Sequence, residues 1–222
     1  MCGRFVLFQD EESLRHSLDA LPGVTETLLP EGAPPPRYNI APTTTVAAVD
    51  LSQPGRAILA PARWGLIPEW KKEISGPPLF NARSETVQDK PSFRGAFARS
   101  RCLVPMDGYY EWKDKQPHFV SLRKGGLLWA AGLYSTALGQ LSVTILTTQS
   151  QPPLEWLHHR MPRFLQAEEM ETWTRGTPQE AAQLLHPSLE PLREQLRTWP
   201  VGREVGRASI DHAGLITPVD AD

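Results

Sequence analysis

The sequence contains little cysteine, no excess of basic charge and no long apolar run. Only Cys2 and Cys102 occur, so at most one disulfide could form, and Cys102 lies in an apolar run where a buried thiol is expected. With 23 basic and 25 acidic residues the formal net charge is −2, so nucleic acid could bind only at a local basic patch. No apolar run reaches membrane-spanning length, and Asp10, Glu11 and Glu12 argue against a signal peptide. We therefore expect a cytoplasmic protein with reduced thiols and no membrane partner.

Several motifs of catalysis and ligand binding are also missing. The sequence has no Cys-x-x-Cys or His-Glu-x-x-His spacing, which argues against the common zinc sites. It has no glycine-rich phosphate loop and no Gly-x-Ser-x-Gly elbow, which argues against nucleotide-phosphate binding and serine hydrolase chemistry. We therefore expect neither a metal ion nor another cofactor.

Proline, by contrast, is abundant, with 22 residues spread over a chain of 222. This distribution indicates many turns and short elements in a chain long enough for a sizeable core. After residue 100, β-forming runs alternate with glycine-containing breaks, which is typical of an antiparallel or barrel-like sheet. No repeat or linker divides the chain, so the sequence predicts a single α+β domain over residues 1–222, with a curved antiparallel, barrel-like core and flanking helices.

The individual elements follow from periodicity and from turn and capping residues. The expected strands are 3–8, 45–49, 57–67, 102–104, 109–112, 118–123, 127–134, 141–148 and one that begins near 198. The expected helices are 10–21, 93–98 and one that begins at the capping box of residues 177–180, with loops at 30–36 and 68–92.

Cysteine directly follows the initiator methionine. Removal of Met1 is expected because a small second residue suits the aminopeptidase, and Cys2 would then carry a free α-amine and a thiol on neighbouring carbons. Such a 1,2-aminothiol forms an imine with an aldehyde, and the thiol then closes a thiazolidine ring. The ordinary pKa of an α-amine, roughly 7.7–8.0, and of a thiol, about 8.5, leave reactive forms near neutral pH. Alternatively, Cys2 is a chance residue of a loosely held terminus.

Four short polar runs place functional groups where neither a core nor a plain loop requires them. They are Arg-Tyr-Asn-Ile-Ala-Pro at 37–42, Asn-Ala-Arg-Ser-Glu at 81–85, Asp-Gly-Tyr-Tyr-Glu-Trp at 107–112 and His-His-Arg-Met-Pro at 158–162.

Each of these side chains also has an ordinary structural explanation. Asn81 could cap a turn, and His158 could cap carbonyl groups at a helix end. Glu111 could face solvent, or it could be buried between its aromatic neighbours, where burial would favour the protonated acid and suit it to proton transfer. The arginines of these runs could be surface charges.

Together with Met-Cys-Gly-Arg-Phe at 1–5 and Trp-Gly-Leu-Ile-Pro at 64–68, the runs form six ordered motifs from the N-terminus to about Pro162. In this order they resemble the SOS-response-associated peptidase family, whose members are also called abasic site processing proteins. The resemblance implies capture of abasic sites in single-stranded DNA as a covalent thiazolidine cross-link through Cys2, which shields the lesion in the DNA damage response. It also implies thiol autopeptidase removal of Met1 and a lyase side activity that proceeds from the imine by β-elimination.

The resemblance further implies roles for the catalytic residues. Cys2 is the nucleophile through both nitrogen and sulfur, and Asn81 orients the sugar or the Cys2 amine. Glu111 is the acid–base group for sugar ring opening and for reversal of the cross-link. His158 matches the catalytic histidine of the His-x-Arg-Met-Pro motif, although the adjacent His159 leaves an ambiguity.

The same resemblance implies the DNA contacts. The residues expected to contact phosphates are Arg4, Arg83 and Arg160, with Arg37 as a further candidate, and those expected to wedge against neighbouring bases are Pro42 and Trp70. The tail departs from the family pattern at Arg207 and Ser209, so DNA contacts there are in doubt. Independently of the family, residues 56–101 hold nine basic against four acidic side chains, which predicts a local basic face.

Three functions are compatible with these residues. The first is a covalent sensor of abasic single-stranded DNA, which needs no dimer and associates with the nucleoid only through DNA. The second is an N-terminal cysteine peptidase or amidohydrolase that uses the thiol as nucleophile and the α-amine as base. The third is a noncovalent single-strand-binding module in which Cys2 is incidental.

Overall fold

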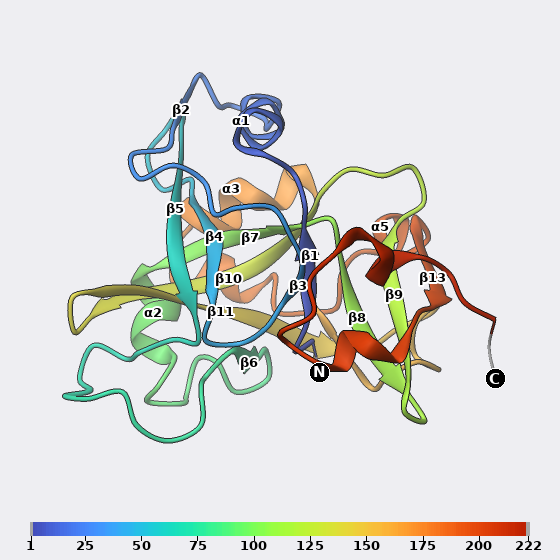
Figure 1. Cartoon of the computed structure of the whole chain (residues 1–222). Helices are drawn as coiled ribbons and strands as arrows, with labels where there is room; N and C mark the ends of the chain where they lie inside the picture. Colours follow the sequence, from blue (N-terminus) through green and yellow to red (C-terminus); the bar gives the residue numbers. More distant parts are fainter. Residues whose placement is uncertain (1, 221–222) are drawn as a thin grey trace.

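Five strands close into a barrel in the computed structural model, which describes residues 2–220 (Figure 1). The pairing of β11 with β5 is parallel, with Val143 opposite Trp64, and the other pairs within the barrel are antiparallel. Because an odd number of alternating strands leaves one parallel pair where the sheet closes, this contact follows from the strand count. The barrel strands are β4 (Thr45–Asp50), β5 (Arg56–Trp64), β7 (Arg101–Met106), β10 (Leu128–Ala137) and β11 (Gln140–Gln149).

Three short strands extend the barrel sheet. Strand β2 (Glu26–Leu28) lies parallel to β5, whereas β6 (Asn81–Arg83) and β12 (Arg160–Pro162) both pair with the second half of β11. Asn81 lies opposite Ile145, and Arg160 lies opposite Gln149. Strand β11 therefore brings together two polar motifs that are far apart in the sequence.

A second, five-stranded antiparallel sheet lies beside the barrel (Figure 1). Its order is β13 (Leu196–Pro200), β9 (Gln116–Leu122), β8 (Gly108–Lys113), β1 (Phe5–Leu7) and β3 (Arg37–Ile40). Strand β1 pairs on one side with β8, where Phe5 is opposite Tyr109, and on the other with β3. The pairing of β1 fixes the position of the residues that precede it.

The helices are short and cap the sheets. They are α1 (Glu11–Asp19), α2 (Arg94–Arg99), α3 (Ala167–Arg175), α4 (Pro178–Ala182) and α5 (Glu190–Arg193), with 3-10 turns η1 (Arg203–Gly206) and η2 (Ala213–Ile216). Asp10 caps α1 by accepting the amide of Ser13 at 2.9 Å, and Thr177 forms the expected capping box with Glu180 at the start of α4.

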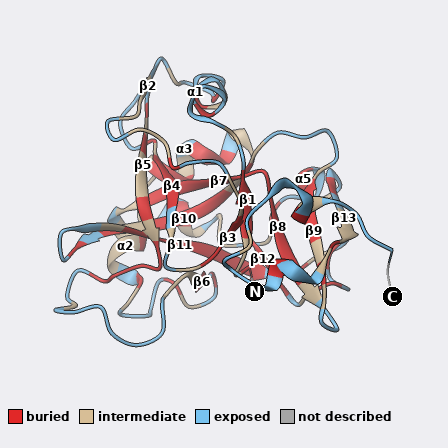
Figure 2. Ribbon diagram, viewed as in Figure 1, coloured by how far each residue is buried: buried red, intermediate tan, exposed pale blue. Residues whose placement is uncertain are grey.

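The barrel strands and β1 are largely buried (Figure 2). Trp64 links the barrel to β1 inside this core. The indole is fully buried and makes edge contacts with Phe5, at 5.0 Å between ring centroids, and with Phe80, at 5.7 Å. Its Nε1–H donates to the carbonyl oxygen of Phe80 at 2.9 Å. The side chain thus holds the end of β5 against both β1 and the segment that leads into β6.

The α+β class with a barrel-like core is confirmed. The strands expected after residue 100 are found within a few residues of their expected bounds, as are those at 3–8, 45–49 and 57–67. The loop expected at 68–92 is wrong in one respect, because it contains β6, and the sequence did not predict β2, β3 or β12. These strands have three or four residues each, too few for a period-2 pattern to stand out.

We predict that Trp64→Ala lowers the free energy of unfolding by about 3–5 kcal/mol, because it removes a buried aromatic side chain and leaves a cavity. Urea denaturation followed by circular dichroism measures the change. Trp70→Ala is the matched control, since this tryptophan is 62% exposed and its loss should cost no more than about 0.5 kcal/mol. Equal effects of the two substitutions would contradict the role assigned to Trp64.

Candidate functional site

Cys2 lies directly before β1, and its side chain is fully buried. Its thiol contacts the carbonyl oxygen of Arg4 at 3.8 Å. Burial raises the pKa of the Cys2 thiol, and the negative charge of Glu111 raises it further. The thiol is therefore neutral near pH 7. The expected removal of Met1 concerns a residue outside the described range.

Asn81 fixes the backbone of Cys2. Its side-chain Nδ2 donates to the carbonyl oxygen of Cys2 at 2.7 Å. Its Oδ1 atom is buried and accepts no hydrogen bond from residues 2–220. Asn81 therefore does not serve as a turn cap, because it sits on β6 and joins that strand to the N-terminal segment. A buried amide oxygen with unused acceptor capacity is suited to a donor from a ligand.

Glu111 and His158 form a carboxylate–imidazole pair beside Cys2. Glu111 on β8 is only 4% exposed, which excludes the solvent-facing alternative, and its Oε2 lies 3.9 Å from Nδ1 of His158. His158 lies in the segment before β12, not at a helix end. Burial lowers the pKa of His158, although the charge of Glu111 acts in the opposite direction.

The geometry also separates the two adjacent histidines. The backbone amide of Arg160 donates to Nδ1 of His158 at 2.9 Å, which holds this ring toward Glu111. The ring of His159 is exposed and stacks on that of His158, with 4.3 Å between centroids. His158 is therefore the histidine that lies against the carboxylate.

Tyr109 belongs to this cluster but was not singled out in the sequence. It shares a face of β8 with Glu111, two residues further on, and is fully buried. Burial raises the pKa of its phenol group, and charge on Cys2 or Glu111 raises it further. The alternation of Tyr109 and Glu111 in the 107–112 motif was the available signal.

Arg160 is buried inside the site's scaffold. Its guanidinium forms two hydrogen bonds with the carboxylate of Glu85, at 2.5 and 3.0 Å, and one with the carbonyl oxygen of Thr147 at 2.6 Å. These bonds connect the 81–85 and 158–162 motifs across β11. A phosphate would have to displace Glu85 to reach this guanidinium, so the expected phosphate contact of Arg160 stays a prediction, and what the structure shows is a positioning contact.

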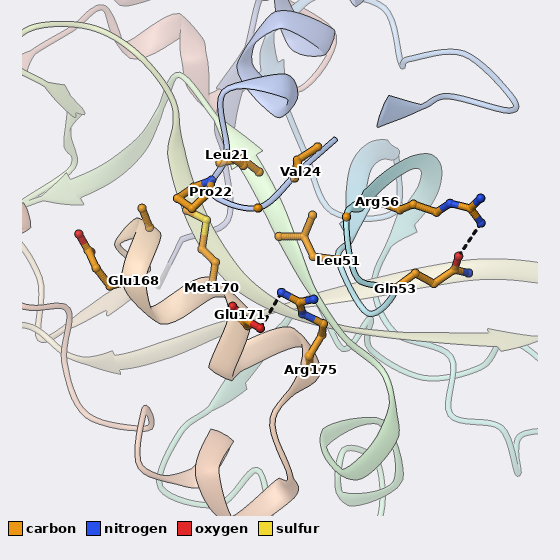
Figure 3. A pocket seen from close by; sticks show the side chains of 13 residues that line it. Leu21, Pro22, Val24, Leu51, Gln53, Arg56, Glu168, Met170, Glu171 and Arg175 are labelled. Carbon is orange, nitrogen blue, oxygen red and sulfur yellow. Dashed lines mark hydrogen bonds and ion pairs between the residues drawn. The ribbon is translucent and has the colours of Figure 1, made fainter. Parts of the chain in front are cut away.

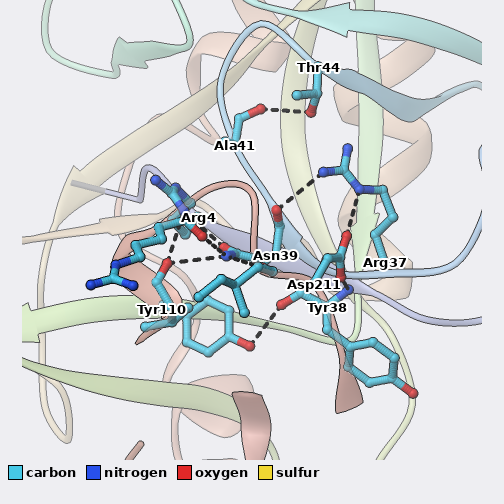
Figure 4. A network of polar contacts seen from close by, with 11 residues as sticks. Arg4, Arg37, Tyr38, Asn39, Ala41, Thr44, Tyr110 and Asp211 are labelled. Carbon is cyan, nitrogen blue, oxygen red and sulfur yellow. Dashed lines mark hydrogen bonds and ion pairs between the residues drawn. The ribbon is translucent and has the colours of Figure 1, made fainter. Parts of the chain in front are cut away.

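Arg4 and Arg37 are bound to the C-terminal segment (Figure 4). Arg4 donates to Oδ1 of Asn39 at 3.0 Å and to the carbonyl oxygen of Val205 at 2.9 Å. Arg37 forms a salt bridge with Asp211 at 2.9 Å. The buried amide of Asn39 also donates to three carbonyl oxygens of this segment, those of Val205, Arg207 and Ile210. The tail thus packs over the first two motifs.

The remaining candidate residues lie further out. Arg83 is exposed on β6, two residues after Asn81 and on the same face of the strand. Pro42 is half-buried just after β3. Trp70 is exposed, and its Nε1–H reaches the carbonyl oxygen of Pro91 at 3.4 Å. These positions keep all three available for contact with a ligand.

Not every cation of the basic window at 56–101 faces solvent freely, and the expected local basic face stays a prediction. Arg101 is buried and donates to the carbonyl oxygens of Trp173, at 2.5 Å, and Phe97. Arg56 pairs with Glu26 at 2.7 Å. Counting charges along the sequence therefore overestimates the charge available to a ligand, because Arg101 is buried and Arg56 is neutralised by Glu26.

A separate hollow of about 130 Å³ lies between the end of α1, the start of β5 and α3 (Figure 3). Glu171 and Arg175 form a salt bridge of 2.8 Å on its wall, and Arg56 donates to Gln53 at 3.1 Å. No residue of the six motifs lines it. The hollow is therefore not the candidate site.

Two properties of residues 2–220 bear on metal binding and membrane insertion. Within this range no three His, Cys, Asp or Glu side chains are grouped so that they could hold a metal ion. In the same range, no helix is both long and apolar enough to cross a membrane.

The chain is thus an α+β protein with a barrel core. A cysteine near its N-terminus is buried, and its thiol lies beside an amide, a carboxylate and an imidazole. The chain belongs to the SOS response associated peptidase (SRAP) family, whose model matches residues 1–208. This confirms the resemblance found in the six motifs.

Similar proteins carry names that describe DNA lesions. The chain is 36% identical over 184 residues to abasic site processing protein YoqW of Bacillus subtilis (strain 168), over 78% of this chain and 80% of that protein. It is 33% identical over 233 residues to abasic site processing protein YedK of Escherichia coli (strain K12), over 99% and 100% of the two chains. A crystal structure of a protein from Bacteroides thetaiotaomicron has the same fold, with a TM-score of 0.78 at 20% identity over 98% of this chain and 100% of that one.

We predict that His158 titrates below about 6.5, the ordinary histidine pKa, and that Glu111→Gln lowers its pKa further, because the substitution removes the negative charge that stabilises the imidazolium. Ring resonances followed by NMR across about pH 4.5–8.5, roughly two units on either side of that value, report the change. Glu155→Gln is the control, since it removes an exposed carboxylate from the same loop. A rise in the pKa of His158 in Glu111→Gln would contradict the pairing of His158 with the Glu111 carboxylate.

Proposed function

We propose that this chain captures abasic sites in single-stranded DNA as a covalent thiazolidine on Cys2. The observation that carries the proposal is the convergence of Cys2, Asn81 and the Glu111–His158 pair at one buried position. The names of relatives such as YoqW and YedK, which are abasic site processing proteins, support the abasic lesion as the target. In this proposal the protein acts on DNA as a monomer and without a metal ion, once Met1 has been removed.

The proposed reaction begins with the sugar. An abasic deoxyribose is a cyclic hemiacetal, and opening it moves a proton from the anomeric hydroxyl to the ring oxygen, leaving an aldehyde. Glu111 and His158 are placed to relay this proton, because a carboxylate and a neutral imidazole side by side can donate and accept in turn. Asn81 would direct its free acceptor oxygen to the sugar or to the Cys2 amine.

The amine is expected to react before the thiol. The raised pKa of the Cys2 thiol leaves little thiolate for a first attack, whereas the neutral amine can add to the aldehyde and release water as the imine forms. The thiol then adds across the C=N bond. Sulfur bonds to the former aldehyde carbon and the thiol proton ends on nitrogen, so this step neither gains nor loses atoms.

Ring closure also explains how the adduct would protect the strand. An imine at the former aldehyde carbon acidifies the neighbouring carbon and promotes β-elimination of the phosphate. The thiazolidine has no C=N bond, so elimination stops when sulfur adds. The lyase activity implied by the family would then be a side reaction of the imine. Reversal of the ring closure would return the imine, and its hydrolysis by water would restore the free protein and the aldehyde.

The outer arginines are proposed to hold the DNA backbone. Arg83 lies on β6 beside Asn81 and is exposed, so it can reach a phosphate next to the captured sugar. Arg4 and Arg37 are bound to the C-terminal segment, and phosphate contact would require them to exchange partners there. Pro42 and Trp70 remain the proposed wedge against neighbouring bases.

We predict that the purified protein lacks Met1 and forms an adduct with an abasic single-stranded oligonucleotide that survives denaturing electrophoresis. Its intact mass should equal that of the protein plus the DNA less one water. Without a reductant, Cys2→Ala and Cys2→Ser should form no stable adduct, because both lack the thiol. Both keep the α-amine, so borohydride reduction of the imine should yield an adduct with either variant.

Cys102→Ala is the matched control, because Cys102 is the other buried cysteine and lies on β7. It should form the adduct as the wild type does. An adduct that persists in Cys2→Ala without a reductant, or that forms equally well when the α-amine is acetylated, would exclude the proposal. Hydrolysis of peptides in trans without any DNA adduct would instead favour the N-terminal cysteine hydrolase.

A further inference from the structure

One large aromatic side chain near the site has no part in the reaction described above. Trp156 is 48% exposed and lies two residues before His158. Its ring meets that of His118 nearly at right angles, at 84° with 5.3 Å between centroids. The contact restrains the indole while almost half of the residue stays open to solvent.

The register of the β8–β9 hairpin connects Trp156 to the site. His118 lies directly opposite Glu111, and Gln116 lies opposite Lys113. Alternate residues of a strand lie on the same face of the sheet, and residues directly opposite each other on paired strands also lie on one face. The side chains of these four residues therefore project from one face of the hairpin. Trp156 packs against that face at His118.

This face runs from the interior to the surface. Glu111 is buried, whereas the side chain of Lys113 is 49% exposed, with its ammonium 3.9 Å from the carboxylate of Asp114. A chain leaving the reaction centre along the face would therefore pass His118 and Trp156 before it reached an exposed lysine.

We propose that Trp156 is a stacking platform for the nucleobase adjacent to the captured abasic nucleotide. The inference rests on the proposed function and deepens it by placing a neighbouring nucleotide. An unpaired base exposes a flat π face, and stacking on an aromatic side chain accepts any base. The platform would orient the strand so that its sugar enters between Cys2 and Glu111, with Lys113 further along the backbone.

The test is the dependence of the cross-linking rate on DNA concentration, measured with full-length protein and an abasic single-stranded oligonucleotide. Trp156→Ala should raise the DNA concentration that gives half-maximal rate by about 5- to 150-fold, the range that corresponds to loss of one base–aromatic stack on alanine substitution. Trp156→Phe keeps an aromatic ring and should restore most of the affinity. Leu189→Ala is the matched surface control, since Leu189 is an exposed apolar residue at the start of α5 and lines none of the site.

A second substrate isolates stacking from other effects. In this substrate a tetrahydrofuran spacer, which has no base, replaces the nucleotide on each side of the lesion. No neighbouring base is then present to stack. The wild type should lose affinity for this substrate, and its advantage over Trp156→Ala should disappear. Persistence of the difference between the two proteins would show that Trp156 acts without a base and would overturn the inference.

The outcomes distinguish failure of the stacking role of Trp156 from failure of the proposed function. If the wild type forms no adduct with either substrate, the proposed function fails and the platform fails with it. If the wild type cross-links and Trp156→Ala shows the same concentration dependence on the ordinary substrate, only the platform fails. Equal urea midpoints for the two proteins establish that the comparison concerns folded chains.

Discussion

The pairing of β11 with two short strands is the constraint on which the site depends. The first half of β11 closes the barrel against β5, and its second half carries β6 and β12. Neither three-residue strand could persist alone, so their positions derive from a ladder already fixed by the barrel. The Arg160–Glu85 bonds then lock the two motifs together across that ladder. Asn81 consequently meets the carbonyl of Cys2, and His158 meets Glu111.

The burial of Cys2 gives the site its chemical character. A thiolate nucleophile is normally obtained by placing the sulfur near positive charge, whereas here desolvation and a carboxylate oppose ionisation. Such surroundings suit a sulfur that acts second, after a carbon atom has already been made electrophilic. The same surroundings keep the thiol from reacting indiscriminately with oxidants or metals in solution.

The sequence was sufficient for the fold class and for the principal strands, because their β-branched runs and glycine breaks are local signals. It also predicted the burial of Cys102 and the capping box at residues 177–180. It could not decide whether Glu111 was buried, because a carboxylate flanked by aromatics fits either face of a strand until the partner strand is known. Nor could it foresee that Arg101 would turn inward, since that depends on carbonyl groups of α3 more than seventy positions away.

The bonds from Asn39 and Arg4 to the carbonyl groups of residues 205–210 limit how far the chain could be shortened. A minimal fragment ending at Gly202 would contain every side chain proposed for catalysis and the whole barrel. It would nevertheless leave the buried amide nitrogen of Asn39 without its acceptors and the guanidinium of Arg4 with Asn39 but without the carbonyl oxygen of Val205. A truncation that kept only the six motifs and the barrel would therefore loosen β1, the strand that follows Cys2.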